Sequence, residues 1–287
     1  MGMTDPTPNR RWFHTTPDRI VIGVLVVEFI LWLSERFQWF GFNQHKGWTV
    51  VIAVALVGAV FLLMLPWFVI ALLFRRRFQF SIRSLLVMVI VVAVPCSWLA
   101  MEMKAAMGQE NAIAAIRRSK GHVEYDYEFE TDETTPFLNE VPHGPTWLRN
   151  LVGDDFFNGV WSANIQKDAD IAHIKRFRHL HCLSFSRDPV GNRDITDVAV
   201  ESLDSLPDLV YLDAWGTRIT DVGMKQVGRL IQLEHLDVHD TRITDVGLER
   251  LKRLRQLQWL SLGGTRVTKQ GIKNFHRALP NCEIVLD

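Results

Sequence analysis

Cysteine is scarce in this sequence: the 287 residues include only three, at Cys96, Cys182 and Cys282. There is no C-x-x-C pair and no Cys/His spacing typical of a zinc site. The sequence therefore predicts neither a disulfide framework nor a structural metal site. We expect the fold to be held together by apolar packing.

The motifs of the common catalytic sites are missing as well. The sequence has no nucleophile elbow, no phosphate-binding loop and no H-E-x-x-H motif. An enzyme assignment would have to rest on residues that only spatial proximity brings together. We therefore predict that the protein is not an enzyme and that it uses no cofactor.

Charge is absent from two long stretches in the N-terminal third. Trp48 to Phe74 contains no charged side chain over 27 residues, and Ser84 to Met101 contains none over 18. Helices of these lengths can cross a hydrocarbon layer of ~30 Å. They predict membrane spans at 48–74 and 84–101.

A third apolar stretch, Ile20 to Leu33, is shorter and contains Glu28. We predict a first span over about 20–40, because bulky aromatic residues typical of an interfacial belt follow it and no small-residue cleavage site of a signal peptide does. A carboxylate within a membrane span is a candidate functional group. The alternative is that Glu28 lies at the interface or packs between helices.

The loop between the second and third predicted spans determines the orientation. It is crowded with arginines, at Arg75, Arg76, Arg77 and Arg83. Short loops rich in Lys and Arg stay in the cytoplasm. Residues 1–19 and this loop are therefore predicted to be cytoplasmic, and residue 102 onward to emerge on the opposite side.

The C-terminal half repeats at an interval of 24 residues. Three aligned columns carry the repeat: Ile195, Ile219, Ile243 and Val267; Thr196, Thr220, Thr244 and Thr268; Leu212, Leu236, Leu260 and Ile284. Alternating apolar residues predict a short strand in each unit, and Thr244 before Asp245 predicts a helix N-cap. Such units stack on one another, because none buries its leucines alone. The sequence predicts an α/β solenoid of parallel strands and short helices.

The segments LVYLDAWGTRITDVGM, LEHLDVHDTRITDVGL and LQWLSLGGTRVTKQGI resemble the leucine-rich repeat family. This resemblance covers roughly residues 157 to 287 and implies a scaffold that binds proteins or other ligands. The segments FQFSIRSLL and WLRNLVGDDFF are similar to parts of bacterial membrane-anchored leucine-rich repeat proteins of unknown role. The second resemblance implies an architecture and no activity.

Residues 102–145 connect the predicted spans to the repeats. Met103 to Ser119 is predicted to continue the third span as a helical stalk, with Gly121 as its C-cap. Residues 123–130 alternate apolar and acidic side chains, which predicts a charged strand at the start of the sheet. Residues 131–145 are rich in Pro and Gly and predict a linker. The repeat domain is then 146–287, with an insertion around 187–192.

The outward side chains of the repeat strands form the candidate binding surface, which we call the sheet face. Its residues are Tyr211, Asp213, Trp215, His235, Asp237, His239 and Trp259. Rigid aromatic residues beside polar groups are typical of protein interfaces. A metal site at His235, Asp237 and His239 and a merely solvated face are the alternatives.

A second row of side chains lies in the turns after the strands, at Arg218, Arg242 and Arg266. Stacked like charges repel one another unless neighbours compensate. We predict that Asp221 and Asp245 form ion pairs with this row; an anion-binding groove is the alternative.

These patterns predict a multi-pass protein of the inner or plasma membrane whose repeat domain is extracytoplasmic, and periplasmic in a bacterium of the Gram-negative type. The span region is 20–101. The repeat domain is predicted to dock a protein or another macromolecule, and nucleic acid is not expected as a partner. The alternative function is a membrane sensor or transporter whose helices act while the repeats regulate.

Overall fold

The computed structural model describes residues 23, 26–34, 47–73, 82–126, 142–177, 179–185 and 194–286. Within the helices, the side chains of 60, 61, 63–73, 82–88 and 91 are not described. The chain divides into two compact units, Met1–Glu102 and Met103–Asp287.

The first unit contains the three apolar stretches. Residues 26–34 are helical, α2 spans Trp48–Leu73, and the first part of α3 (Ile82–Arg118) follows. Across the described residues, no helix combines the length and the apolar character needed to cross a membrane. The three membrane spans therefore remain a prediction. Arg75, Arg76 and Arg77 lie outside the described residues, and the side chain of Arg83 is not described.

In the second unit, the C-terminal part of α3 forms the first layer of the solenoid. The helix predicted for Met103 to Ser119 is confirmed, because α3 extends to Arg118. It is not a free stalk, since Ala112, Ile113 and Ile116 are buried in the same apolar core as the repeats. Burial of these apolar side chains stabilises the packing of the helix against the repeat sheet.

The end of α3 differs in detail from the prediction that Gly121 is its cap. The N–H of Gly121 donates to the carbonyl of Ile116 over 2.9 Å, as in a Schellman motif, and the left-handed residue is Lys120, with φ 67°. Gly121 is required for a different reason. A Cβ there would lie 2.5 Å from the backbone oxygen of Asn164, so Gly121 permits close contact with strand β2 (Val160–Asn164).

One seven-stranded sheet runs through the second unit in the order β1 to β7. The strands are β1 His122–Tyr125, β2 Val160–Asn164, β3 Cys182–Ser184, β4 Tyr211–Asp213, β5 His235–Asp237, β6 Trp259–Ser261 and β7 Glu283–Val285. Strand β1 pairs antiparallel to β2, and all later pairs are parallel. The predicted acidic strand at the start of the sheet is therefore confirmed for His122–Tyr125, while 127–130 lie outside the described residues.

The predicted repeat register is confirmed. Leu183, Leu212, Leu236 and Leu260 are aligned across successive strands, and each is fully buried. The isoleucines at 195, 219 and 243 are fully buried as well. These columns form a continuous apolar core between the sheet and the helices, which is the architecture of a leucine-rich repeat. The predicted insertion at 187–192 lies outside the described residues.

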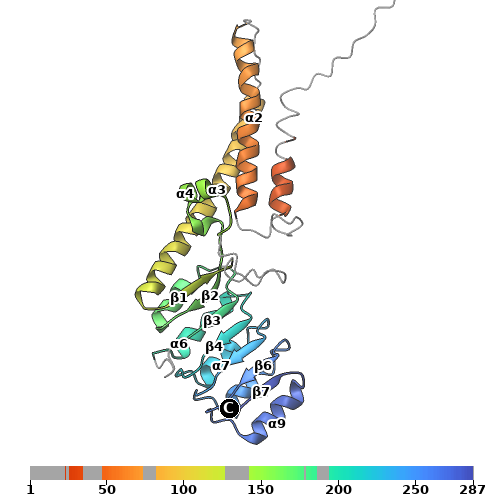
Figure 1. The fold of residues 1–287 in the computed structure, drawn as a ribbon. Coiled ribbons are helices and arrows are strands. Elements are labelled where there is room, and N and C mark those ends of the chain that lie inside the picture. The colour runs from red at the N-terminus through yellow and green to blue at the C-terminus, as the bar shows by residue number, and fades with distance from the viewer. Residues whose placement is uncertain are drawn as a thin grey trace, which may run out of the picture. The chain divides into compact units, whose positions relative to one another are not determined.

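Short helices connect the strands. They are α4 Thr146–Val152, α5 Ile171–Ile174, α6 Asp197–Val200, α7 Asp221–Val227, α8 Asp245–Leu251 and α9 Lys269–Ala278, with 3-10 turns at Asp154–Phe156, Asp168–Asp170 and Leu203–Ser205. Figure 1 shows the strands following one another along the solenoid, with α6 and α7 along one side of the sheet. α7 packs against α8, and α8 against α9.

Each of the helices α6 to α9 begins after a threonine N-cap, as predicted for Thr244. The hydroxyl groups of Thr196, Thr220 and Thr244 each accept a hydrogen bond from the backbone N–H two residues later, and Thr268 accepts from Gly271. The same threonines also bind an aspartate of the preceding unit. For Thr244, the backbone N–H and the hydroxyl donate to the two carboxylate oxygens of Asp221, over 2.8 and 2.7 Å. This joint links one repeat to the next.

The joint recurs along the solenoid with the pairs Asp168 and Thr196, Asp197 and Thr220, Asp221 and Thr244, and Asp245 and Thr268. It also explains a recurring glycine. The N–H of Gly247 donates to Asp221 over 2.9 Å, and a Cβ at Gly247 would collide with the same carboxylate oxygen. The T-D-x-G pattern is therefore a contact between repeats.

Candidate functional site

The sheet face is built by the strand register. Tyr211, His235 and Trp259 occupy equivalent positions on β4, β5 and β6, and Asp213 and Asp237 occupy the next outward position. Adjacent strands lie ~4.8 Å apart, so side chains in one row are direct neighbours. The structure thus brings the predicted residues onto one surface.

Aromatic side chains dominate the sheet face and are half-buried by their neighbours. The rings of Tyr211 and His235 lie 6.1 Å apart between centroids, and those of Trp215 and His239 lie 6.4 Å apart. Half-buried rings lose little further freedom on binding and supply a large apolar area. They form a rigid surface with polar groups at its margin.

Asp213 and Asp237 have a structural role at the end of each strand. Asp213 accepts hydrogen bonds from the N–H of Trp215 over 3.0 Å and from the hydroxyl of Ser184 over 2.9 Å. Asp237 accepts from the N–H of His239 over 2.9 Å. These bonds hold the turns that carry Trp215 and His239, so the aspartates position the aromatic residues that follow them.

The two carboxylates also give the sheet face a negative potential. Burial raises the pKa of Asp213, the hydrogen bonds from Trp215 and Ser184 oppose that rise, and the charge of Asp237 adds to it. Burial also raises the pKa of Tyr211, and the charges of Asp213 and Asp237 raise it further. A partner that presents a cation here would relieve this repulsion.

The early strands extend the surface with residues that the sequence analysis missed. Trp161 and His181 stack with ring centroids 3.9 Å apart and an interplanar angle of 12°. Asn164 donates to Ser184 over 3.2 Å, and Ser184 donates to Asp213, so a polar row runs from β2 to β4. Because the early units do not follow the 24-residue interval, the sequence analysis did not align these positions with the later strands. Aligning residues 160–164 with the later strands would have found them.

The possible metal ligands do not converge. Among the described residues, no group of three or more His, Cys, Asp or Glu side chains is arranged to hold a metal ion. Instead, the ring of His235 lies beside Tyr211, and His239 lies beside Trp215, with its Nε2 3.8 Å from Asp240. His235, Asp237 and His239 therefore belong to the sheet face as separate contacts.

The predicted ion pairs of the arginine row are wrong. In the described part of the chain, Arg218, Arg242 and Arg266 make no ion pair, and all three are exposed. The aspartates that were expected to neutralise them are engaged elsewhere: Asp221 binds Thr244, and Asp245 binds Thr268. The neighbouring repeat binds the carboxylates and leaves the guanidinium groups to solvent.

Glu28 lies in the helical residues 26–34 of the first unit. Its side chain is buried, and neither carboxylate oxygen accepts a hydrogen bond within the part of the chain that the structure describes. Buried polar atoms are normally hydrogen-bonded, so this carboxylate is unusual.

Comparison with known proteins identifies leucine-rich repeat structures at low similarity. No protein-family model matches the sequence, and no curated protein matches it. Among solved structures, the chain is similar to an internalin of Listeria monocytogenes (20% identity, TM-score 0.30), covering 42% of this chain and 32% of that one. It is also similar to the repeat ectodomain of the receptor kinase SOBIR1 of Arabidopsis thaliana (17% identity, TM-score 0.36), covering 62% and 91%.

A third similar structure is a leucine-rich repeat protein of Leptospira interrogans, with 19% identity and a TM-score of 0.26, covering 40% of this chain and 32% of that one. The match therefore spans about a third of the internalin and of the Leptospira protein. The leucine-rich repeat assignment of this chain rests on its own 24-residue register and parallel sheet.

Proposed function

We propose that this protein is a membrane-anchored interaction protein that is not an enzyme, and that the sheet face of its repeats binds a protein partner. The observation that carries the proposal is the surface formed by Tyr211, Trp215 and Trp259 together with His235 and His239. These rings are fixed by strand register and by hydrogen bonds to the turns. Interfaces concentrate their binding energy in such rigid aromatic side chains.

The charge of the sheet face supports a partner with a basic patch. Asp213 and Asp237 lie on adjacent strands. Tyr211 and Trp215 flank Asp213 in sequence, and His235 and His239 flank Asp237. A lysine or arginine of the partner would pair with the carboxylates and stack on a ring, and both contacts favour a cation. A merely solvated face gives no reason for tryptophans at both 215 and 259.

The membrane anchor is part of the same proposal. Its support is in the sequence, in the 27-residue uncharged stretch from Trp48 to Phe74 and the arginine-rich loop after it. By the positive-inside rule this loop stays cytoplasmic, so the repeats would be displayed on the extracytoplasmic side. Protease added to sealed cells from which the wall has been removed should digest the repeats. Digestion only in inverted vesicles would reverse the proposed orientation.

Site-specific photo-crosslinking tests the sheet face directly. A photoreactive residue replaces Trp215 or Trp259 in the full chain, or Val198 or Ile231 in the matched controls, which are exposed outside the strands. We expect one discrete crosslinked protein from the sheet-face positions and none from the controls. Substituting Tyr211 by Ala should remove that product without changing the melting temperature. Equal crosslinking from the two sets would refute the assignment.

A second candidate function, a sensor or transporter acting through the helices, rests on Glu28. A buried carboxylate without a hydrogen-bond partner among the described residues is typical of a group that exchanges a proton or binds an ion. The Glu28→Gln variant in proteoliposomes separates the two functions. Proton or ion flux that depends on Glu28 would favour transport, whereas a docking protein shows no flux in either form.

A further inference from the structure

The arginine row (Arg218, Arg242 and Arg266) is held in a fixed register by the backbone. The N–H of Arg218 donates to the carbonyl of Ile195, that of Arg242 to Ile219 and that of Arg266 to Ile243, over 2.9, 3.3 and 2.9 Å. These bonds join each turn to the preceding one. Successive arginines are therefore spaced as adjacent strands are, at ~4.8 Å.

The residue before each arginine is also anchored. The hydroxyl groups of Thr217, Thr241 and Thr265 donate to the carbonyl oxygens of Ala214, Val238 and Leu262, over 2.8, 2.6 and 2.6 Å. Thr217 and Thr241 are buried. Because the backbone is fixed on both sides, the arginines project from a rigid edge of the solenoid.

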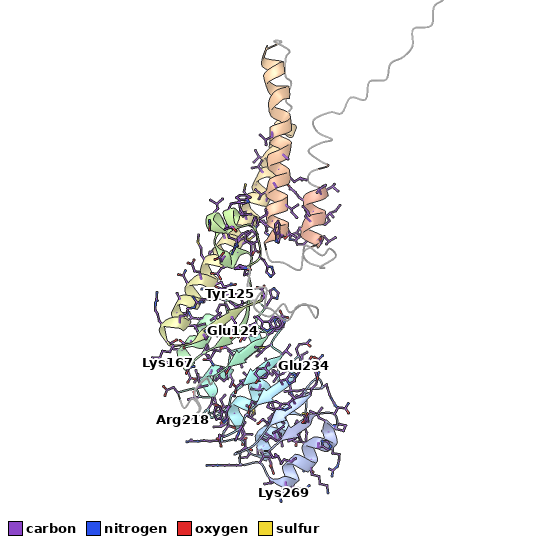
Figure 2. The ribbon with its side chains drawn as sticks, in the orientation of Figure 1. Glu124, Tyr125, Lys167, Arg218, Glu234 and Lys269 are labelled. Carbon is purple, nitrogen blue, oxygen red and sulfur yellow. The ribbon has the colours of Figure 1, made fainter. Side chains whose placement is uncertain are left out.

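None of the three arginines forms an ion pair within the described part of the chain. Asp221 and Asp245 accept hydrogen bonds from the next repeat, and Asp240, two residues before Arg242, lies 3.8 Å from Nε2 of His239. Asp194 occupies the equivalent position one repeat before Arg218, so the positive row begins at Arg218. The last unit has Lys269 at the position equivalent to Asp245, which adds a further exposed positive charge. In Figure 2, Arg218 lies at the opposite edge of the sheet from Glu234. The positive edge is thus separate from the acidic side chain at the strand starts.

Like charges in adjacent positions destabilise a sheet. A row of arginines without ion pairs therefore lowers the stability of the solenoid. From this we infer that the arginine row binds a linear anionic polysaccharide that carries one carboxylate per sugar. Guanidinium groups bind carboxylates with two parallel hydrogen bonds, which suits one arginine to each acidic sugar. This site is distinct from the sheet face and does not depend on the function proposed for that face.

The spacing and the surroundings favour this occupant over two others. An extended acidic peptide places side chains of the same side two residues apart, at about 6.8 Å, which does not match the strand spacing. Single-stranded nucleic acid binds where aromatic residues stack on its bases. The residues flanking the arginines are Thr217 and Ile219, Thr241 and Ile243, and Thr265 and Val267, and none is aromatic.

An apolar row accompanies the charges. Val222 and Val246 lie four residues after Arg218 and Arg242, and they are 65% and 59% exposed. Exposed valines at equivalent positions of two repeats provide apolar contacts for the C–H faces of sugar rings. Arginines and exposed valines that recur together in the same two repeats match a polymer that has both acidic groups and apolar faces.

Calorimetric titration of the full chain, in micelles of an uncharged detergent, with an oligogalacturonate of defined length tests the inference. The R218Q/R242Q/R266Q variant should lose at least about tenfold in affinity, because three charge-assisted contacts are removed. The matched control is R250Q/R253Q/R255Q, which removes the same charge from exposed positions in and after α8. We expect the control to stay within about twofold of the unmodified protein, since nonspecific attraction is screened by salt.

A lysine variant controls for misfolding of the glutamine variant. R218K/R242K/R266K restores the charges and should recover part of the affinity, although lysine does not make the two parallel bonds. The inference is overturned if the unmodified protein does not bind oligogalacturonate, or if the control loses as much affinity as the row variant. It is also overturned if single-stranded DNA or anionic lipid vesicles bind as tightly as the oligogalacturonate.

Discussion

The joint between Asp221 and Thr244 should make a large contribution to the stability of the solenoid. The Asp221→Ala substitution removes the acceptor of three donors: the N–H and the hydroxyl of Thr244, and the N–H of Gly247. Hydrogen bonds to a charged group contribute roughly 1.5–3 kcal/mol each, but these groups are half-buried and water replaces part of the loss. We expect Asp221→Ala to lower the free energy of unfolding by about 2 to 4 kcal/mol.

The glycine opposite this carboxylate supplies a sharper test. In the unmodified protein, the Cβ of Gly247→Ala collides with Asp221, and we expect a loss of about 1 to 3 kcal/mol. Once Asp221 is alanine, that collision is gone, although the added Cβ still meets the side chains of Ile243, at 2.9 Å, and Met224, at 3.2 Å. Alanine is a better helix former than glycine by up to ~1 kcal/mol, which offsets part of this crowding, so Gly247→Ala should then cost clearly less than in the unmodified protein. The size of its effect should therefore depend on Asp221.

Urea unfolding of the full chain, followed by tryptophan fluorescence, measures this double-mutant cycle. Asp204→Ala is the control, because Asp204 is exposed and makes no hydrogen bond or ion pair with the described residues, so it should change stability by less than about 0.5 kcal/mol. If the effects of Asp221→Ala and Gly247→Ala were additive, the carboxylate and the glycine would not share one contact, and the repeat joint would be refuted.

Three further predictions concern other parts of the second unit. Because burial raises the pKa of Asp213, the folded state holds more protons than the unfolded state between the ordinary pKa of 3.8 and the raised value. The free energy of unfolding should fall as pH rises through that window. Asp213→Asn does not titrate, so its free energy of unfolding relative to that of the unmodified protein should increase over the same pH range, as measured by urea unfolding. Lys120→Gly should stabilise by up to about 1 kcal/mol, because Lys120 has φ 67°, whereas Gly121→Ala should destabilise; thermal melting measures both. Gln109→Leu should cost about 1 to 3 kcal/mol in urea unfolding, because Gln109 is buried and donates to Asp155 over 2.8 Å and to the carbonyl of Asn158 over 3.0 Å.

The repeat part of the fold could be predicted because its signals are local and periodic. The leucine and isoleucine columns determine the stacking register, and threonine before aspartate marks the starts of α6, α7 and α8, so both agree with the structure. The same alternation of side chains placed Tyr211, His235 and Trp259 on one face. Positions that depend on strand register follow directly from sequence once the period is known.

The partners of the charged side chains could not be predicted in the same way. Distance along the chain pointed from Arg218 to Asp221, three residues later, but Asp221 binds Thr244, 23 residues away. The packing of the predicted helix at Met103 to Ser119 could not be predicted for a similar reason, since the burial of Ile113 and Ile116 depends on a sheet edge that only the folded chain creates. Sequence spacing predicts local neighbours, and these contacts are made between different repeats.

Asp221 belongs to the repeat joint and also lies three residues after Arg218, so one variant at Asp221 tests both the joint and the arginine row. If Asp221 is engaged with Thr244 in solution, it does not neutralise the arginine row, and Asp221→Asn should change the affinity for oligogalacturonate by less than about twofold at physiological salt, which weakens interactions between exposed charges. If Asp221 instead pairs with Arg218, removing its charge frees the guanidinium and the affinity should rise clearly. Calorimetric titration of Asp221→Asn at 0.15 M salt distinguishes these results, with Asp204→Asn as the control for net charge. A rise in affinity confined to Asp221→Asn would show that the arginine row is compensated by an ion pair, and the reason for expecting a polyanion at this edge would be lost.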